Sequence, residues 1–442
     1  MMLADIAPVA SDDILPERTD VVVIGGGIIG TSLALFLAER NVSVVLCEKG
    51  RIAGEQSSRN WGWCRQMGRD PREIPLIIES LALWRQMNDR LGEEAGFRTT
   101  GILYLATTEE DVARHEQWLQ HARSYQLDSQ LIGTERVAEL LPQSVKRWKG
   151  ALYTPSDGKA EPFIAAPAIA RGARRAGAKI FTNCAVRGIE RQAGHISGVV
   201  TEKGRIACSQ VVLAGGAWSS LFCGSLDVRL PQLKILSSVL RTTPIEGPAP
   251  SAWGPGFAYR KRADGGYTVA HGGLISPELV PDSFAFFSDF LPTLQLEWKS
   301  IRPRLSGRFF EEWNTPRRWA LDQISPFEKT RIFDPRPRSG ELNAALANLR
   351  QVFPLFQDAR VTDSWAGYID VMPDAVPVIS GVDSIPGFFV ATGFSGHGFG
   401  IGPGAGRLMA DLVTGSTPIV DPSPFRFSRF NDGSKISLYG RH

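Results

Sequence analysis

The sequence predicts a fold of the combined α/β and α+β class, in which a Rossmann-type dinucleotide-binding domain is interleaved with a domain built on an antiparallel sheet. Three features predict it: a glycine-rich βαβ unit at residues 19–48, strands with period-two alternation from about residue 236, and a second glycine-rich loop after residue 392. A chain of 442 residues is too long for one ordinary core, so we expect two domains.

The first unit contains the parts of a dinucleotide site in the required order. Residues 21–24 are a β-branched apolar run typical of a buried parallel strand, residues 31–40 are expected to form a helix, and residues 42–46 a second strand. Three glycines with G-x-G-x-x-G spacing follow the first strand: Gly25, Gly27 and Gly30. They allow a tight turn, approach to a pyrophosphate and close helix packing. Glu48 can accept from both ribose hydroxyls.

The glycine spacing alone is weak evidence, because it also occurs in merely structural βαβ units. Here strand, glycines, helix, strand and acid follow one another within about thirty residues, which favours a dinucleotide site. The loop at residues 49–63 adds small residues, hydroxyls and a guanidinium. Such a loop can return to the pyrophosphate and reach a flavin, which favours FAD over a nicotinamide cofactor. A solvated surface loop is the alternative, but Trp61 and Trp63 fit poorly with it.

The composition excludes several functional classes. Apolar residues make up 43% of the chain and charged residues 21%, and the net charge of +3 argues against nucleic-acid binding. The five cysteines show no C-x-x-C or zinc spacing, so we expect no metal site and reduced thiols of an intracellular protein. Residues 1–18 lack a basic segment with an apolar core, and no run of eighteen apolar residues occurs. We expect no secretory signal, no membrane span and a cytoplasmic location.

The elements in the middle of the chain follow from periodicity. Apolar spacing predicts helices at residues 75–91, 109–125, 134–141 and 162–177. Strands are expected at residues 98–107, 179–186, 188–202 and 211–219. The last of these ends in small residues, as where a backbone approaches a ligand. Period-two alternation then predicts an antiparallel sheet with strands at residues 237–243, 257–261 and 267–271.

The segment at residues 284–319 is unusually rich in phenylalanine and tryptophan. The favoured interpretation is a helical segment packed on the sheet. The alternative is a surface that faces lipid or a partner. Peripheral membrane association through this segment therefore stays open beside a cytoplasmic location.

The chain returns to α/β character near its end, with short apolar strands at residues 376–380 and 388–392. The glycine-rich loop at residues 393–402 then opens a helix that runs through residues 405–412. Backbone N–H groups at such a helix start form an anion cradle, suited to the electron-rich N1–C2=O edge of a reduced flavin. His397 in this loop is expected at the flavin edge, and a structural turn histidine is the alternative.

On these three regions the chain resembles the D-amino-acid-oxidase-type FAD-dependent oxidoreductases, the group with glycine and sarcosine oxidase. The resemblance rests on the N-terminal G-x-G-x-x-G, the Ala-Gly-Gly-Ala-Trp strand end at residues 214–218 and the Gly-His-Gly of the C-terminal loop. A closer similarity is to the bacterial membrane-associated L-amino-acid deaminases. It rests on the sequences of residues 48–59, 178–185, 200–204 and 325–329.

The resemblance implies a FAD-binding domain interleaved with an antiparallel-sheet substrate domain. On this division the FAD-binding domain comprises residues 1–95, 150–235 and 355–442. The substrate domain comprises residues 96–149 and 236–354, with an aromatic helical insertion at about 284–325. In the deaminases the corresponding insertion attaches to the membrane.

Residues that bind the cofactor are expected in all three regions of the resemblance. They are Gly25, Gly27, Ile28, Gly30, Glu48, Lys49, Ser57, Ser58, Arg59, Asn60, Trp61, Val186, Gly215, Trp218, Gly396, His397, Gly398 and Gly400. We expect FAD to be held without a covalent bond. Relatives with a covalent flavin use a cysteine in the C-terminal half or a histidine soon after the ribose acid. Here no cysteine follows Cys223, and residues 49–70 contain no histidine.

The substrate-binding residues differ from those of the relatives. The deaminases place a carboxylate-binding arginine on the strand that corresponds to residues 266–274, where this sequence offers Tyr267, His271 and glycines. The arginine that glycine oxidase uses near the Trp-Ala-Gly position is here Tyr368. These three residues, with Arg65, are the candidates for contact with the reacting substrate.

A cation is still required if the substrate carries a carboxylate, because burying that group unpaired costs several kcal/mol. Arg65 is the first choice and Arg69 the second, since both follow the Trp61-Gly-Trp63 turn. Tyr259 and Arg260 are neighbours on one strand, so only one of them can face the pocket, and we expect it to be the tyrosine.

The resemblance implies FAD-dependent oxidation of the C–N bond of an amino acid by hydride transfer to flavin. The product is an imine that hydrolyses to a 2-oxo acid and ammonia. Two alternatives stay open: oxidation of an N-substituted amino acid or secondary amine, as in sarcosine- or opine-oxidising relatives, and a flavoprotein subunit of an electron-transfer complex. The electron acceptor is expected to be oxygen or a membrane quinone chain.

Overall fold

The structure is a computed structural model that describes residues 5–273, 277–297 and 301–439. A six-stranded sheet has the strand order β21 (Val378–Gly381), β22 (Phe388–Thr392), β13 (Gln210–Leu213), β1 (Val21–Ile24), β2 (Val44–Cys47) and β9 (Lys179–Phe181). Its strands are parallel except β21, which is antiparallel to β22.

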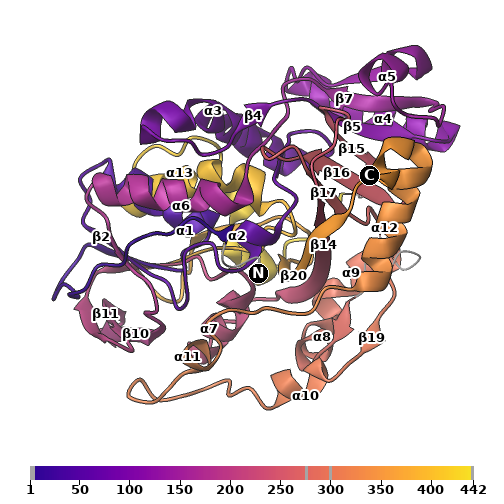
Figure 1. The fold of residues 1–442 in the computed structure, drawn as a ribbon. Helices are drawn as coiled ribbons and strands as arrows, with labels where there is room; N and C mark the ends of the chain where they lie inside the picture. The colour runs from indigo at the N-terminus through magenta and orange to yellow at the C-terminus, as the bar shows by residue number, and fades with distance from the viewer. Residues whose placement is uncertain (1–4, 274–276, 298–300, 440–442) are drawn as a thin grey trace.

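Both faces of this sheet are covered, which explains the uninterrupted apolar sequence of β1. Val21 and Val23 belong to the core on the helical side, and Val22 and Ile24 to the core on the opposite side. On the helical side α1 (Ile28–Ala38) packs against α6 (Pro162–Arg175) and α13 (Gly398–Thr414), and α13 packs on α3 (Ile74–Leu91). Figure 1 shows this group of helices together. The opposite side carries the three-stranded sheet of β10 (Val186–Gln192), β11 (His195–Thr201) and β12 (Gly204–Ala207).

An eight-stranded sheet forms the second half of the molecule. Its order is β20 (Val361–Val371), β14 (Leu233–Thr242), β17 (Tyr267–Ala270), β16 (Phe257–Lys261), β15 (Ser251–Gly254), β5 (Ile102–Ala106), β7 (Gly150–Thr154) and β6 (Gln130–Gly133). The strands are antiparallel except at the β15–β5 pair. The helix α12 (Ser339–Val352) covers one face, as Figure 1 shows.

The remaining elements are short or lie outside the two large sheets. Three two-residue strands, β3 (Trp63–Cys64), β8 (Gly158–Lys159) and β4 (Arg98–Thr99), form a small sheet. The pair β18 (Glu278–Leu279) and β19 (Arg304–Leu305) is parallel. The other α-helices are α2 (Gln56–Arg59), α4 (Glu109–Ser124), α5 (Thr134–Leu140), α7 (Ser219–Ser225), α8 (Pro281–Ala285), α9 (Phe287–Glu297), α10 (Arg308–Trp313) and α11 (Pro326–Lys329). The 3-10 helices are η2 (Pro71–Glu73), η3 (Gly216–Trp218), η4 (Pro354–Gln357), η5 (Ser423–Phe425) and η6 (Phe427–Phe430).

The predicted class, a Rossmann-type unit combined with an antiparallel-sheet domain, is confirmed. The eight-stranded sheet includes two strands that the sequence pattern does not predict, β7 and β20. β7 and β20 fall in ranges assigned to the FAD-binding domain, yet both lie in the eight-stranded sheet. β20 pairs with β14 over almost its whole length, and β7 is the antiparallel partner of β5. Strand pairing between distant segments determines this membership, and no local pattern reports it.

The aromatic segment is only partly packed against the sheet. Phe286 and Phe290 are buried against Val371 of β20, as the favoured interpretation requires. Other aromatic side chains of α8, α9 and α10 are exposed: Phe284, Phe287, Phe310 and Trp313. Trp298, which the sequence counts in this segment, and Leu274, in the strand range compared with the deaminases, lie outside the described residues. Within the described ranges the helices are either too short or too polar to cross a bilayer.

Candidate active site

The glycine turn between β1 and α1 has the close contacts that require glycine. Gly25 has φ +111°, and a Cβ on it would lie 2.4 Å from the carbonyl oxygen of Ala214. A Cβ on Gly30 would lie 2.0 Å from the carbonyl oxygen of Gly25. Gly27 is the N-cap of α1 and provides no side-chain cap. The Ile28 N–H donates to the Ser57 hydroxyl at 2.8 Å. The dipole and the other N–H groups at the amino end of α1 favour a phosphate group.

Glu48 stands directly after β2 and beside this turn. One carboxylate oxygen accepts from the Gly26 N–H at 2.7 Å, and the other accepts from the Gly50 N–H at 2.7 Å. Burial raises the pKa of Glu48, and Lys49 and these two N–H groups act against that rise. Each oxygen retains a lone pair for a ribose hydroxyl. The geometry is that of an acid fixed by backbone donors at the end of the second strand, as a dinucleotide site requires.

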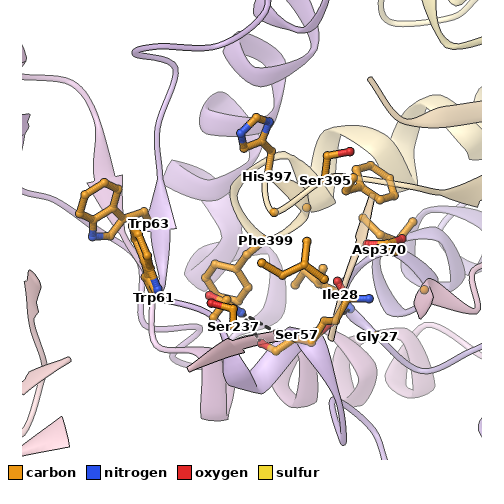
Figure 2. A pocket seen from close by; sticks show the side chains of 18 of the residues that line it. Gly27, Ile28, Ser57, Trp61, Trp63, Ser237, Asp370, Ser395, His397 and Phe399 are labelled. Atoms are coloured by element: carbon orange, nitrogen blue, oxygen red, sulfur yellow. Dashed lines mark hydrogen bonds between the residues drawn. The ribbon is translucent and has the colours of Figure 1, made fainter. Parts of the chain in front are cut away.

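Two adjoining cavities lie next to this turn. The smaller, of about 110 Å³, is lined by Glu48 and the glycines, and the larger, of about 380 Å³, extends to the tryptophan pair. They share five lining residues: Gly27, Gln56, Ser57, Ala214 and Gly216. Figure 2 shows Trp61 and Trp63 at one end of the larger cavity and Asp370 at the other. An extended dinucleotide fits this arrangement, with its ribose at Glu48, its phosphates at the start of α1 and its ring system in the larger cavity.

Most of the residues expected to bind the cofactor line one of the cavities. The smaller cavity is lined by Gly25, Gly27, Glu48, Lys49, Ser57, Val186, Gly215 and Trp218. The larger cavity is lined by Gly27, Ile28, Ser57, Arg59, Asn60, Trp61, Gly396, His397 and Gly398. Gly30, Ser58 and Gly400 line neither cavity. Ser58 donates to the Glu55 carbonyl, Gly30 lies under the turn, and Gly400 allows α13 to approach Trp63 and Cys64.

Only two of the four candidates for substrate contact line the larger cavity. Arg65 and Tyr368 line the larger cavity, and Tyr267 and His271 do not. Tyr267 packs edge-on against Phe356 with ring centroids 4.8 Å apart, and its hydroxyl donates to the Pro248 carbonyl at 3.0 Å. The expectation that Tyr267 and His271 face the cavity is therefore corrected.

Tyr259 does not face the cavity as expected, and Arg260, on the opposite face of the strand, does not line the cavity either. Tyr259 is fully buried among Phe257, Tyr267 and the residues of α12, on the face of the sheet away from the cavity. Arg260 takes the other face, where its guanidinium donates to the Trp61 carbonyl at 2.6 Å and to Glu161 at 2.6 Å. The two side chains point to opposite faces of the strand, as predicted. The face covered by α12 is the apolar one, and Tyr259 lies on that face.

Three arginines line the larger cavity. Arg59 pairs with Asp334 at 2.7 Å, and Arg69 pairs with Glu73 at 3.2 Å and donates to the His397 carbonyl at 3.2 Å. Arg65 donates to the Met67 carbonyl and lies over the Tyr104 ring, 5.6 Å from its centroid. Among these three, Arg65 is the one with no carboxylate partner in the part of the chain that the structure describes.

His397 lies on the loop that leads into α13. Its Nδ1 is 3.3 Å from a carboxylate oxygen of the buried Glu73. Burial lowers the pKa of His397 to about 4, although Glu73 acts in the opposite direction. The imidazole is therefore neutral near pH 7 and adds no charge to the cavity.

Sequence reasoning missed Asp370, at the end of β20. Its carboxylate accepts from the Gly393 N–H at 2.7 Å and the Thr392 hydroxyl at 3.2 Å, so it holds the start of the C-terminal loop. Burial raises the pKa of Asp370 to about 6. An acid within an apolar strand is the one local signal that could have found it. Tyr439, which also lines the larger cavity, has no such signal in the sequence.

Known proteins resemble this chain in sequence and structure. The structure of an L-amino acid deaminase from Proteus myxofaciens, in complex with anthranilate, matches with a TM-score of 0.93 and 36% identity over 96% of both chains. Sarcosine oxidase subunit beta of Arthrobacter sp is 25% identical over 96% of this chain and 94% of its own length. Mouse mitochondrial sarcosine dehydrogenase is 24% identical, but this chain spans only 43% of its length.

The resemblance read from the sequence is confirmed, and with it the assignment of FAD and of amine-oxidising chemistry. FAD-dependent oxidation of an amino acid or N-substituted amino acid is the activity common to these relatives. The family model described as FAD dependent oxidoreductase matches residues 20–412. Given the glycine turn, the fixed Glu48 and a match over nearly the whole chain, the protein belongs to the FAD-dependent oxidoreductase family and is an enzyme that acts on amine donors.

Proposed function

We propose that the protein oxidises the Cα–N bond of a free amino acid, giving an imine that hydrolyses to a 2-oxo acid and ammonia. The observation that carries the proposal is Arg65, a cavity-lining guanidinium without a carboxylate partner among the described residues. A substrate carboxylate needs such a partner when it enters an enclosed site. The 36% identity to the Proteus myxofaciens deaminase supports the same substrate class.

Bound FAD would accept the hydride from the substrate Cα. The residues of the chain position the substrate for that transfer. Arg65 binds the carboxylate, and the tryptophan pair with Tyr104 encloses the side chain and excludes water. Tyr368 donates to Glu278 at 3.2 Å and packs under Arg308, 3.6 Å from its ring centroid, so it acts as a wall and not as a base. We further propose that FAD is bound non-covalently.

Contact with a membrane surface is part of this proposal. The exposed aromatic residues lie on three packed helices, since α8 contacts both α9 and α10. Together with the exposed Leu291 and Leu305 they make up the exposed aromatic region. Arg317 and Arg318, which follow α10 in the chain, are more than half exposed, and each pairs with a carboxylate: Arg317 with Asp282 and Arg318 with Asp227. Aromatic side chains flanked by cations suit the interface of an anionic bilayer. This location would bring the flavin within reach of a membrane quinone chain and favours it over oxygen as electron acceptor.

Oxidation of an N-substituted amino acid is the second candidate. The similarity to sarcosine oxidase subunit beta favours this candidate. The same similarity supports the alternative that this protein is one subunit of a larger complex. The carboxylate would again lie at Arg65. The two candidates differ in the amine that is released.

A single experiment separates these candidates. The purified protein is mixed anaerobically with L-, D- and N-methyl amino acids in turn while the flavin absorbance is followed. We expect primary amino acids to bleach the flavin and to release ammonia. Bleaching only by N-methyl substrates would establish the second candidate, with release of methylamine if the Cα–N bond is oxidised and of formaldehyde if the N-methyl group is oxidised. A flavin that no substrate reduces in the isolated protein, but that is reduced after a partner is added, would establish the subunit.

A further inference from the structure

The chain after η6 crosses to the other half of the molecule. Arg426 pairs with Asp432 at 3.1 Å and donates to the Ser434 hydroxyl at 2.6 Å, which fixes the start of this tail, residues 431–439. Further along, Arg72 donates to the Ser437 carbonyl at 3.0 Å. Arg72 also pairs with Asp70, a residue that lines the larger cavity. The tail therefore passes along the rim of that cavity.

Tyr439 connects the tail with α4. Its hydroxyl forms a hydrogen bond with His121 Nε2, and the two rings meet edge-on with centroids 4.9 Å apart. Tyr439 also lines the larger cavity together with Arg65 and Tyr104. With 42% of its surface exposed, the side chain has one side on the cavity and another on solvent. It thus forms part of the outer wall.

We propose that the Tyr439 ring closes the outer end of the cavity and must move aside for a molecule to pass, so that Tyr439 determines which substrates enter. The residues of the tail are exposed or half-buried, and the tail is held by hydrogen bonds near the surface. Segments with few buried contacts open at low cost in free energy, and such segments often control access to an enzyme site. The Tyr439–His121 contact holds the tail in the closed position.

Three single variants of the full-length, FAD-loaded protein test this proposal. Tyr439→Ala removes the wall, and His121→Ala removes the contact that holds it. Tyr125→Ala is the matched control, because Tyr125 is an exposed tyrosine at the end of α4 that does not line the cavity. The first readout is iodide quenching of the fluorescence of bound flavin, which requires no substrate. The second is the rate of flavin bleaching with primary amino acids of increasing side-chain size.

We expect both Tyr439→Ala and His121→Ala to raise the iodide quenching constant severalfold and to flatten the dependence of bleaching on side-chain size. Tyr125→Ala should match the parent protein. Unchanged quenching in Tyr439→Ala would overturn the proposal, as would an equal increase in Tyr125→Ala. The quenching result depends on the bound flavin alone, so it stands even if the substrate proves to be an N-substituted amino acid.

Discussion

At the scale of single residues, Glu48 is expected to bind the ribose of the cofactor. Glu48→Ala removes the acceptor for the ribose hydroxyls and also releases the N–H groups of Gly26 and Gly50. Hydrogen bonds to a carboxylate contribute about 1.5–3 kcal/mol each, so the variant should purify with little flavin. The flavin-to-protein ratio measures this, with circular dichroism as the check on folding. Glu48→Gln keeps the shape and should lose less flavin; full occupancy in Glu48→Ala would show that the ribose is held elsewhere.

The two arginines of the tryptophan loop should respond differently to substitution. Arg65→Ala should raise the apparent substrate constant by about 10- to 100-fold with unchanged FAD content, as expected for the loss of one charge-assisted pair. Arg69→Ala leaves the buried Glu73 without its ion pair and should instead lower thermal stability. Titration of flavin bleaching with substrate measures the first effect and thermal unfolding the second. If Arg65→Ala bleaches with the parental substrate dependence, the carboxylate is held elsewhere.

The buried Asp157 positions the segment that carries both arginines. Its carboxylate accepts from the N–H groups of Gln66 at 2.7 Å and Met67 at 3.3 Å. Burial raises the pKa of Asp157 to about 7, although these N–H groups oppose the rise. The folded state thus keeps a proton that the unfolded chain, with an aspartate pKa of about 3.9, has already lost. Stability from this group is present at low pH and falls as the pH rises from about 4 to about 7, by up to about 1.4 kcal/mol per pH unit.

Asp157→Asn removes this titration. Relative to the parent protein, the variant should gain free energy of unfolding as the pH rises through that window. Urea unfolding of both proteins at about pH 5 and about pH 8, with saturating FAD, measures the difference. A difference that stays the same at both pH values would contradict the assignment.

At the scale of elements, the contact between α13 and α1 depends on a glycine. A Cβ on Gly406 would lie 2.5 Å from the Ser32 Cβ and 2.7 Å from the Leu33 nitrogen. Gly406→Ala should therefore cost about 1–3 kcal/mol of stability through overpacking. A Cβ on Gly340, in the first turn of α12, would meet no packed neighbour within 4 Å, so Gly340→Ala should be neutral or stabilising by up to about 1 kcal/mol. Urea unfolding of the pair measures both, and equal effects would contradict the packing argument.

The sequence predicts local units well and distant pairings poorly. The turn at Gly25–Gly30 and the acid at Glu48 were predictable because the glycine spacing and the acid at the strand end lie in one short segment, although the Ala214 carbonyl that lies against Gly25 belongs to a distant part of the chain. The positions of Tyr259 and Tyr267 were not, because alternation separates the two faces of a strand without saying which one α12 covers. The position of Tyr439 at the cavity could not be predicted for a related reason. Its tail, residues 431–439, forms no helix or strand, so the sequence has no periodic pattern that would place it.

At the scale of the whole molecule, the exposed aromatic region should decide membrane binding. The double variant Phe310→Ser with Trp313→Ser removes two side chains that are 64% and 69% exposed on α10. It should bind vesicles of mixed zwitterionic and anionic lipid severalfold more weakly than the parent protein, since less apolar surface can enter the interface. Flotation of protein with vesicles measures this. Val145→Ser, an exposed apolar residue away from the region, serves as control, and equal flotation of all three proteins would contradict membrane contact.

The strand order of the six-stranded sheet has a consequence for biosynthesis. β1 and α1 are synthesised well before α13, which packs on α1 and ends at residue 414, and before β22, which joins the same sheet next to β13. Until α13 emerges, the apolar side of α1 that it covers is unprotected, and the loop of His397 does not yet exist. Because domains generally fold as units once their chain is available, this one completes its flavin pocket only after α13 has been synthesised. Loading of the flavin is therefore expected once the chain has been made at least as far as residue 414.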